Sequence, residues 1–284
     1  SIMGNSGYSS SARSARAASA GYSTKSASEI FTQSHMHKDM NPKDISFRES
    51  RDSELHPNAI PIQLYLDVTG SMGRIPHQMI KDGLPKLMGS LIENGVPDAA
   101  LMFGAIGDHE KDNCPLQVGQ FESGDAELDM WLTRTYLEGG GGGNGGESYL
   151  LAWYFAGNHV KTDAFDKRKE KGFVFTVGDE PCLPNLPMSA IKEIMNSTAA
   201  GEGTTREQLL AAAQKQNHVY HIHVNHGSSS DPAWKELLGK NLIEITDHTT
   251  LSRVISDIIL SHAVKPSVVV KKETEIDHSE ENFL

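Results

Sequence analysis

Five short apolar runs alternate with helix-like segments along this chain, and this alternation limits the folds it can adopt. The runs predict β-strands at 62–66, 99–106, 172–177, 219–224 and 241–245. Strands of a parallel sheet read as continuous apolar runs because helices cover both of their faces. Strands separated by helices therefore predict an α/β fold with a doubly wound, mostly parallel sheet.

Helical patterns fill the intervals between these runs. Pro85 should kink or divide the first helix, because proline donates no backbone hydrogen bond and its ring clashes with the preceding turn. A short run at 117–121 is expected to be an antiparallel edge strand that returns from the loop at 108–115. The expected helices lie at 74–93, 125–137, 147–158, 188–197, 204–216 and 249–262.

The composition changes at both ends of this alternating pattern. Residues 59–263 are expected to form one domain, between a low-complexity, extended arm at 1–58 and a tail at 264–284, where 267–270 could add an edge strand. Residues 1–30 have too few large apolar side chains to offset chain entropy, so we expect them to be disordered by themselves. The arm is either a passive linker or an assembly arm that orders on binding. Its candidate contacts are Arg13, Arg16, Phe31 and Phe47.

The overall charge and the cysteines narrow the class of protein. A net charge of -11 and a pI near 5.6 argue against a nucleic-acid surface, because phosphate binding needs clustered Lys and Arg. The two cysteines, Cys114 and Cys182, lie in Pro-flanked loops and predict no disulfide framework. No apolar run approaches the roughly 20 residues that span a bilayer, and the N-terminus lacks an apolar signal core. These features predict a cytoplasmic protein.

Oxygen-bearing side chains follow the first apolar run. The run ends at Asp67, and Thr69 and Ser71 come after it at alternate positions. Gly70 lets the backbone turn there, so the three side chains can point at one centre. Hard oxygen ligands of this kind suit Mg²⁺ or Mn²⁺ rather than zinc. The alternative is an ordinary helix N-cap, in which hydroxyl groups accept backbone N–H bonds.

Two later segments extend this pattern. A glycine loop at 141–147 contains Asn144 and Glu147, and the third apolar run is followed by Asp179. Together with the first motif, they resemble the metal-ion-dependent adhesion site (MIDAS) of the von Willebrand factor A (VWA) family, in its intracellular and bacterial branch. Thr69 stands where Ser is usual, and Asn144 stands where Thr or Asp is usual. Asn144 supplies only a neutral amide oxygen, and Glu147 either compensates for the missing charge or caps its helix.

The resemblance covers approximately residues 60–262 and implies a Rossmann-like VWA fold with helices on both faces of the sheet. It implies an Mg²⁺ or Mn²⁺ site whose open position takes a Glu or Asp carboxylate from a partner. The protein would then be an interaction module or adaptor and not an enzyme, acting beside an AAA+ ATPase or another subunit of a complex. The implied metal-site residues are Asp67, Thr69, Ser71, Asn144, Glu147 and Asp179.

Three other readings stay open. Acids around Mg²⁺ can also activate water, which would make the protein a hydrolase with Glu180 or His109 as its general base. The protein could instead be a structural subunit that assembles, or oligomerises, through its terminal arms, and such assembly would survive metal removal. His221 and His223 share one face of a strand, so they are either zinc ligands or neutral core residues.

Overall fold

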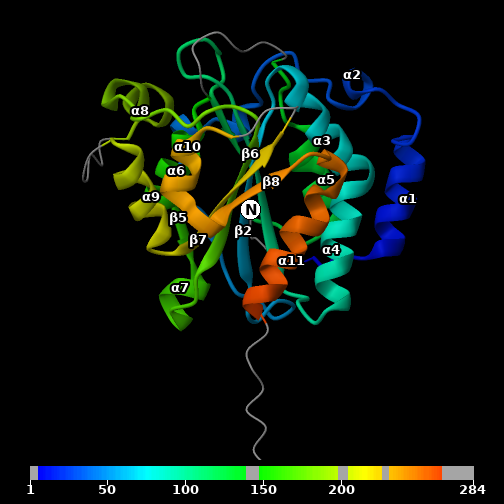
Figure 1. The fold of residues 1–284 in the computed structure, drawn as a ribbon. Coiled ribbons are helices and arrows are strands. Elements are labelled where there is room, and N and C mark those ends of the chain that lie inside the picture. The colour runs from blue at the N-terminus through cyan, green and yellow to red at the C-terminus, as the bar shows by residue number, and fades with distance from the viewer. Residues whose placement is uncertain (1–5, 139–146, 198–203, 226–229, 264–284) are drawn as a thin grey trace, which may run out of the picture.

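A six-stranded sheet forms the centre of the protein (Figure 1). The computed structural model describes residues 6–138, 147–197, 204–225 and 230–263. The strand order is β4-β3-β2-β6-β7-β8, and all neighbours are parallel except β3 and β4. This confirms the mostly parallel sheet with one antiparallel edge strand. The strands are β2 Ile60–Asp67, β3 Ala99–Ile106, β4 Leu116–Val118, β6 Gly172–Gly178, β7 Asn217–Val224 and β8 Leu242–Ile245.

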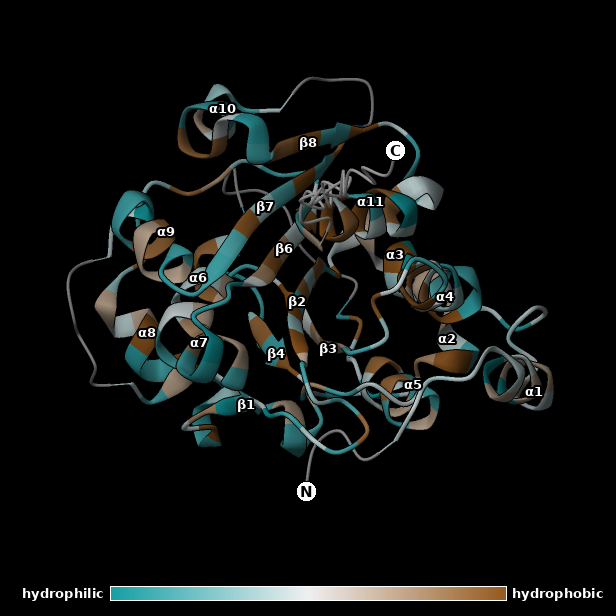
Figure 2. Ribbon diagram, turned by 90° about the horizontal axis from the view of Figure 1, so that it is seen from below, coloured by the Kyte–Doolittle hydropathy of each residue, from teal (hydrophilic) through white to brown (hydrophobic). Residues whose placement is uncertain are grey.

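Helices cover both faces of this sheet, which runs diagonally between them in Figure 2. One layer contains α3 Arg74–Gln78, α4 Leu84–Glu93, α5 Asp125–Thr133 and α11 Leu251–Ala263. The other contains α6 Tyr149–Asn158, α8 Met188–Met195, α9 Arg206–Gln214 and α10 Pro232–Leu238. None of the helices in the described ranges is both long and apolar enough to cross a membrane.

The central strands divide their side chains between two apolar cores. In β2, Leu64 and Leu66 face the layer of α4 and α11, whereas Tyr65 faces the layer of α6. Every residue of β3 is buried. Alternate residues of a strand point to opposite faces, so a strand with helices on both sides is mostly apolar along its whole length. The continuous apolar runs of the sequence arise from this arrangement.

The first long helical segment is divided, as Pro85 predicts. Between α3 and α4 the chain forms one π-helical turn at Met79–Gly83. Pro85 then occupies the first turn of α4, and the backbone stays helical at Gln78 and Leu84 on either side of the π turn. The division therefore places the proline at the start of a new helix.

The N-terminal arm, which we expect to be disordered by itself, forms the helix α1 Ser10–Ala20 where it packs on the domain. The hydroxyl of Ser9 accepts a bond from the N–H of Ala12 and caps the start of the helix, and Gly21 ends it at a φ of 70°. The apolar composition of the arm gives no sign of this helix, because a buried cation attaches it to the domain. Arg13 is 1% exposed, and its Nη1 lies 3.2 Å from Asp125 Oδ1 and 2.7 Å from Asp129 Oδ1.

The other candidate contacts of the arm also lie on its own domain. Arg16 forms an ion pair with Asp125 at 2.7 Å, and Phe31 is buried in the core that contains α4. Phe47 is 44% exposed, with the ammonium of Lys161 3.8 Å from the centroid of its ring. A short helix, α2 Ala27–Ile30, lies between α1 and Phe31. The arm thus packs against the domain of its own chain.

Some elements were not predicted, and one prediction lies outside the described residues. A separate two-stranded parallel sheet pairs β1 Arg48–Ser50 with β5 Val160–Thr162, and α7 Asp163–Arg168 follows it. Strands this short have little apolar pattern to detect. The strand expected at 267–270 lies beyond the described part of the chain.

Candidate metal site

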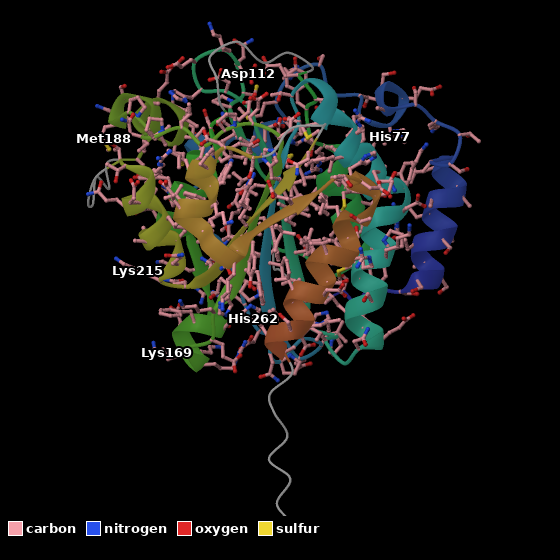
Figure 3. The ribbon with its side chains drawn as sticks, viewed as in Figure 1. His77, Asp112, Lys169, Met188, Lys215 and His262 are labelled. Carbon is pink, nitrogen blue, oxygen red and sulfur yellow. The ribbon has the colours of Figure 1, made fainter. Side chains whose placement is uncertain are left out.

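The candidate site lies where the winding direction of the sheet reverses. Strand β2 has β3 on one side and β6 on the other, so the loops after β2 and β6 leave the sheet as neighbours. Asp67 ends β2, and Asp179 follows β6. Open α/β sheets bind ligands at such a point, outside the carboxyl ends of the strands. Figure 3 labels Asp112 at this end of the molecule and Lys169 and His262 at the opposite end.

Asp67 is fully buried, and hydrogen bonds hold both of its carboxylate oxygens. Its Oδ1 accepts bonds from the N–H of Thr69 at 2.8 Å and from the Thr69 hydroxyl at 2.5 Å, and its Oδ2 accepts one from the Tyr149 hydroxyl at 3.3 Å. Gly70 follows at a φ of 46°, which favours glycine. Burial raises the pKa of Asp67 to about 7. The charge of Asp179 also raises this pKa, whereas the hydrogen bonds from Thr69 and Tyr149 lower it. Asp67 therefore has a fixed orientation and a raised proton affinity in this site.

Glu147 reaches the same place from a loop far along the chain. Its Oε1 lies 3.2 Å from the Thr69 hydroxyl, and the residue is 2% exposed. Burial raises its pKa to about 9, with the charge of Asp67 as the next cause. Its Oε2 makes no hydrogen bond within the described residues. A buried carboxylate oxygen without a partner, beside a second buried carboxylate, fits a divalent cation with oxygen ligands.

The other predicted residues are less completely described. Asp179 is half-buried and acts electrostatically on both Asp67 and Tyr149. The backbone of Ser71 lies in a 3₁₀ turn, but its side chain, like the whole of Asn144, lies outside what is described. Within the described ranges, no group of three or more His, Cys, Asp or Glu side chains is arranged to hold a metal ion. A MIDAS-type arrangement differs from such a group because it also uses hydroxyl oxygens.

The sequence reading missed two residues beside these carboxylates. Tyr149 begins α6 within an apolar segment, so its pattern is that of a core residue. Asp108 is 1% exposed in the loop after β3, and its Oδ2 makes no hydrogen bond in the described part of the chain. The carbonyl of Gly107 accepts the N–H of Ser148 at 3.2 Å, which brings this loop against the one that contains Glu147. A loop acid has no local signal of such burial.

The two candidate general bases occupy different positions around the site. The Nδ1 of His109 lies 2.7 Å from the hydroxyl of Ser148, which is fully buried. The N–H of Glu180 donates to the Tyr149 hydroxyl at 3.3 Å. Burial, followed by the charge of Asp179, raises the pKa of Glu180. The described contacts of His109 join its loop to Ser148, just before α6, and those of Glu180 join its loop to α6 and α10.

His221 has the surroundings of a core histidine. Its Nδ1 lies 2.8 Å from the Thr176 hydroxyl, and its ring stacks on Trp234 with 3.6 Å between centroids. Burial lowers its pKa well below the usual value, and the neighbouring His223 adds to this effect. His221 is therefore neutral at physiological pH, in agreement with the core interpretation.

Comparison with known proteins gives only distant similarity in fold. No family model matches the sequence, and no curated protein matches it. Among solved structures, the open conformation of the pilus adhesin SpaC from Lactobacillus rhamnosus GG has a TM-score of 0.45 at 6% identity, over 75% of this chain and 31% of that chain. Proximal thread matrix protein 1 from the mussel byssus, with a zinc-occupied MIDAS motif, has a TM-score of 0.45 at 11% identity, over 76% and 49%. A second crystal form of that protein gives 0.44 at 11%, over 75% and 49%. This chain thus spans less than half the length of each of these structures.

Proposed function

We propose that this protein is a cation-dependent interaction module that binds an acidic residue of a protein partner through a MIDAS-type site, as the VWA-like motif implies. One observation carries the proposal. The Thr69 hydroxyl contacts Glu147, 78 positions away in the sequence, and also contacts the buried carboxylate of Asp67. Oxygen-bearing side chains from separate loops thus meet at the switch point of the sheet.

In this proposal, each predicted residue has a defined part. The hydroxyls of Thr69 and Ser71 would bind Mg²⁺ or Mn²⁺ directly, and Asp67 and Asp179 would act largely through water. Asn144 would add a neutral oxygen, so the Glu147 oxygen that makes no hydrogen bond within the described residues would supply the missing negative charge. When bound, the cation supplies positive charge with an open position for an external carboxylate.

The partner class and the compartment belong to the same proposal. We infer a protein partner with an exposed Glu or Asp, such as an AAA+ ATPase or another subunit of a complex. We also infer a cytoplasmic location, which is supported by the free thiols of Cys114 and Cys182.

The test begins with the cation alone. Isothermal titration with Mn²⁺ and with Mg²⁺ would compare the wild-type protein with Asp67→Ala and with Asp257→Ala, which removes an exposed carboxylate from α11 as a charge-matched control. We expect binding by the wild type and the control and loss of binding in Asp67→Ala. Equal binding by all three proteins would place the cation elsewhere and reject the proposed site.

A second measurement tests the partner. Capture from the native cell lysate would compare the wild type in Mg²⁺, the wild type in EDTA, and folded Asp67→Ala. A partner retained only by the metal-loaded wild type, and lost when its own acidic residue is replaced, supports the proposal. The same partners in all three samples would favour assembly through the terminal arms.

A further inference from the structure

Tyr149 joins the candidate cation site to a distant helix. Its hydroxyl donates to Asp67 Oδ2 and accepts the N–H of Glu180, both at 3.3 Å. Asp67 is the last residue of β2 and Glu180 follows β6, so one phenol oxygen bridges the ends of two neighbouring strands. We propose that Tyr149 is a positioning residue of this site, which orients Asp67 and couples cation binding to α10.

The packing around Tyr149 fixes its hydroxyl in this position. Tyr149 is fully buried, and its ring contacts His221 and Trp234 edge-on at centroid distances of 5.0 and 5.4 Å. Gly178 leaves the space that the hydroxyl fills, because a Cβ there would lie 1.9 Å from the Tyr149 oxygen. The close approach of this phenol therefore explains why a glycine precedes Asp179.

The bridge continues from Glu180 to α10. The carbonyl of Glu180 accepts the indole N–H of Trp234 at 3.1 Å, and Trp234 is fully buried in α10. The ring of Trp234 stacks on His221 of β7. A contiguous chain of hydrogen bonds and packed rings thus runs from Asp67 to α10. A shift of the Asp67 carboxylate toward a cation would be transmitted along it.

The hydroxyl of Tyr149 is suited to a fixed donor role. An ionised carboxylate oxygen can only accept, so the phenol is the donor in its 3.3 Å hydrogen bond to Asp67 Oδ2. With Oδ1 of Asp67 held by Thr69, the Tyr149 hydroxyl orients the other oxygen. Partners of this kind around metal ligands typically contribute about 10- to 100-fold in metal affinity.

The inference rests on the proposed function, and Tyr149→Phe tests it because it removes only the hydroxyl. Tyr154→Phe is the matched control, since Tyr154 lies in the same helix and its hydroxyl bonds Ser197 at 2.7 Å. We expect Tyr149→Phe to weaken Mn²⁺ binding about 10-fold or more, with Tyr154→Phe close to wild type. Wild-type affinity in Tyr149→Phe would overturn the inference while leaving the proposed function intact. A wild-type protein that binds no Mn²⁺ would reject both.

Hydrogen exchange provides a readout that a purely structural role would not change. In the wild type, Mn²⁺ should slow exchange of the Glu180 amide and of α10, with α7 as the unaffected reference. In Tyr149→Phe at saturating Mn²⁺, the slowing in α10 should be lost. Unchanged exchange in α10 of the wild type would overturn the coupling, and it can be measured even if Tyr149→Phe does not fold.

Discussion

Replacing Arg13 with Met should detach or strongly destabilise the N-terminal helix. The Arg13 guanidinium lies between Asp125 and Asp129, its Nη2 bonds the carbonyl of Ile80, and the side chain is 1% exposed. After the replacement, Asp129 keeps, among the described residues, only the neutral hydroxyl of Tyr22, which lies 2.9 Å from each of its oxygens. Asp125 keeps its ion pair with the partly exposed Arg16, so Asp129 is the carboxylate that loses its buried counter-charge.

The magnitude follows from this partial compensation. Removing one member of a buried ion pair costs about 3–5 kcal/mol, and the remaining Tyr22 bonds place Arg13→Met near the lower end, at about 3 kcal/mol. For a chain of this size, about 3 kcal/mol corresponds to a fall in Tm of roughly 6–12 °C. If α1 detaches before the core unfolds, the loss in global stability is smaller and the arm becomes sensitive to protease.

Calorimetry combined with limited proteolysis would measure this effect. Arg16→Met is the matched control, because the side chain of Arg16 is 40% exposed and such surface pairs contribute at most about 1 kcal/mol. Adding Asp129→Asn to Arg13→Met should recover part of the loss, since it removes the uncompensated charge. If Arg13→Met lowers stability by no more than Arg16→Met, and the arm stays resistant to protease, the buried ion pair does not attach α1.

Three other outcomes are expected. Gly178→Ala should lower the free energy of unfolding by about 1–3 kcal/mol, because the added methyl group overlaps the fixed hydroxyl of Tyr149; urea unfolding at wild-type stability would contradict this contact. Burial raises the pKa of Glu122 from 4.5 to about 7, so as pH rises the carboxyl group loses its proton in the unfolded chain before it does so in the native state. The native state therefore loses stability as pH rises from about 4.5 to about 7, and this loss stays constant at higher pH. Glu122→Gln should therefore gain about 2–3 kcal/mol over the wild type between pH 5 and pH 8 in urea unfolding, and a pH-independent difference would refute the burial argument. Mn²⁺ at about 100 times its Kd should stabilise the wild type by about 2.7 kcal/mol in calorimetry, and EDTA or Asp67→Ala should abolish this gain; equal stabilisation of Asp67→Ala would contradict the site.

The sequence by itself determined the order and type of the main elements. The apolar runs of β2, β3 and β6 are long enough to show that both faces of each strand are covered, and Pro85 marks the helix division by its own covalent structure. The placement of Asp67 and Asp179 at the carboxyl ends of strands follows from the alternating pattern. These features are local, or follow from rules that connect local elements, so they can be read without coordinates.

Tertiary structure alone decided which distant polar groups meet. Arg13 pairs with acids more than 100 positions away, so a segment that reads as disordered becomes a helix on the domain. Thr69 meets Glu147, and Tyr149, which reads as a core residue, uses its hydroxyl at Asp67. Such pairs leave no periodic pattern in a single sequence, because a buried hydrogen bond or ion pair depends on three-dimensional proximity and on exclusion of water.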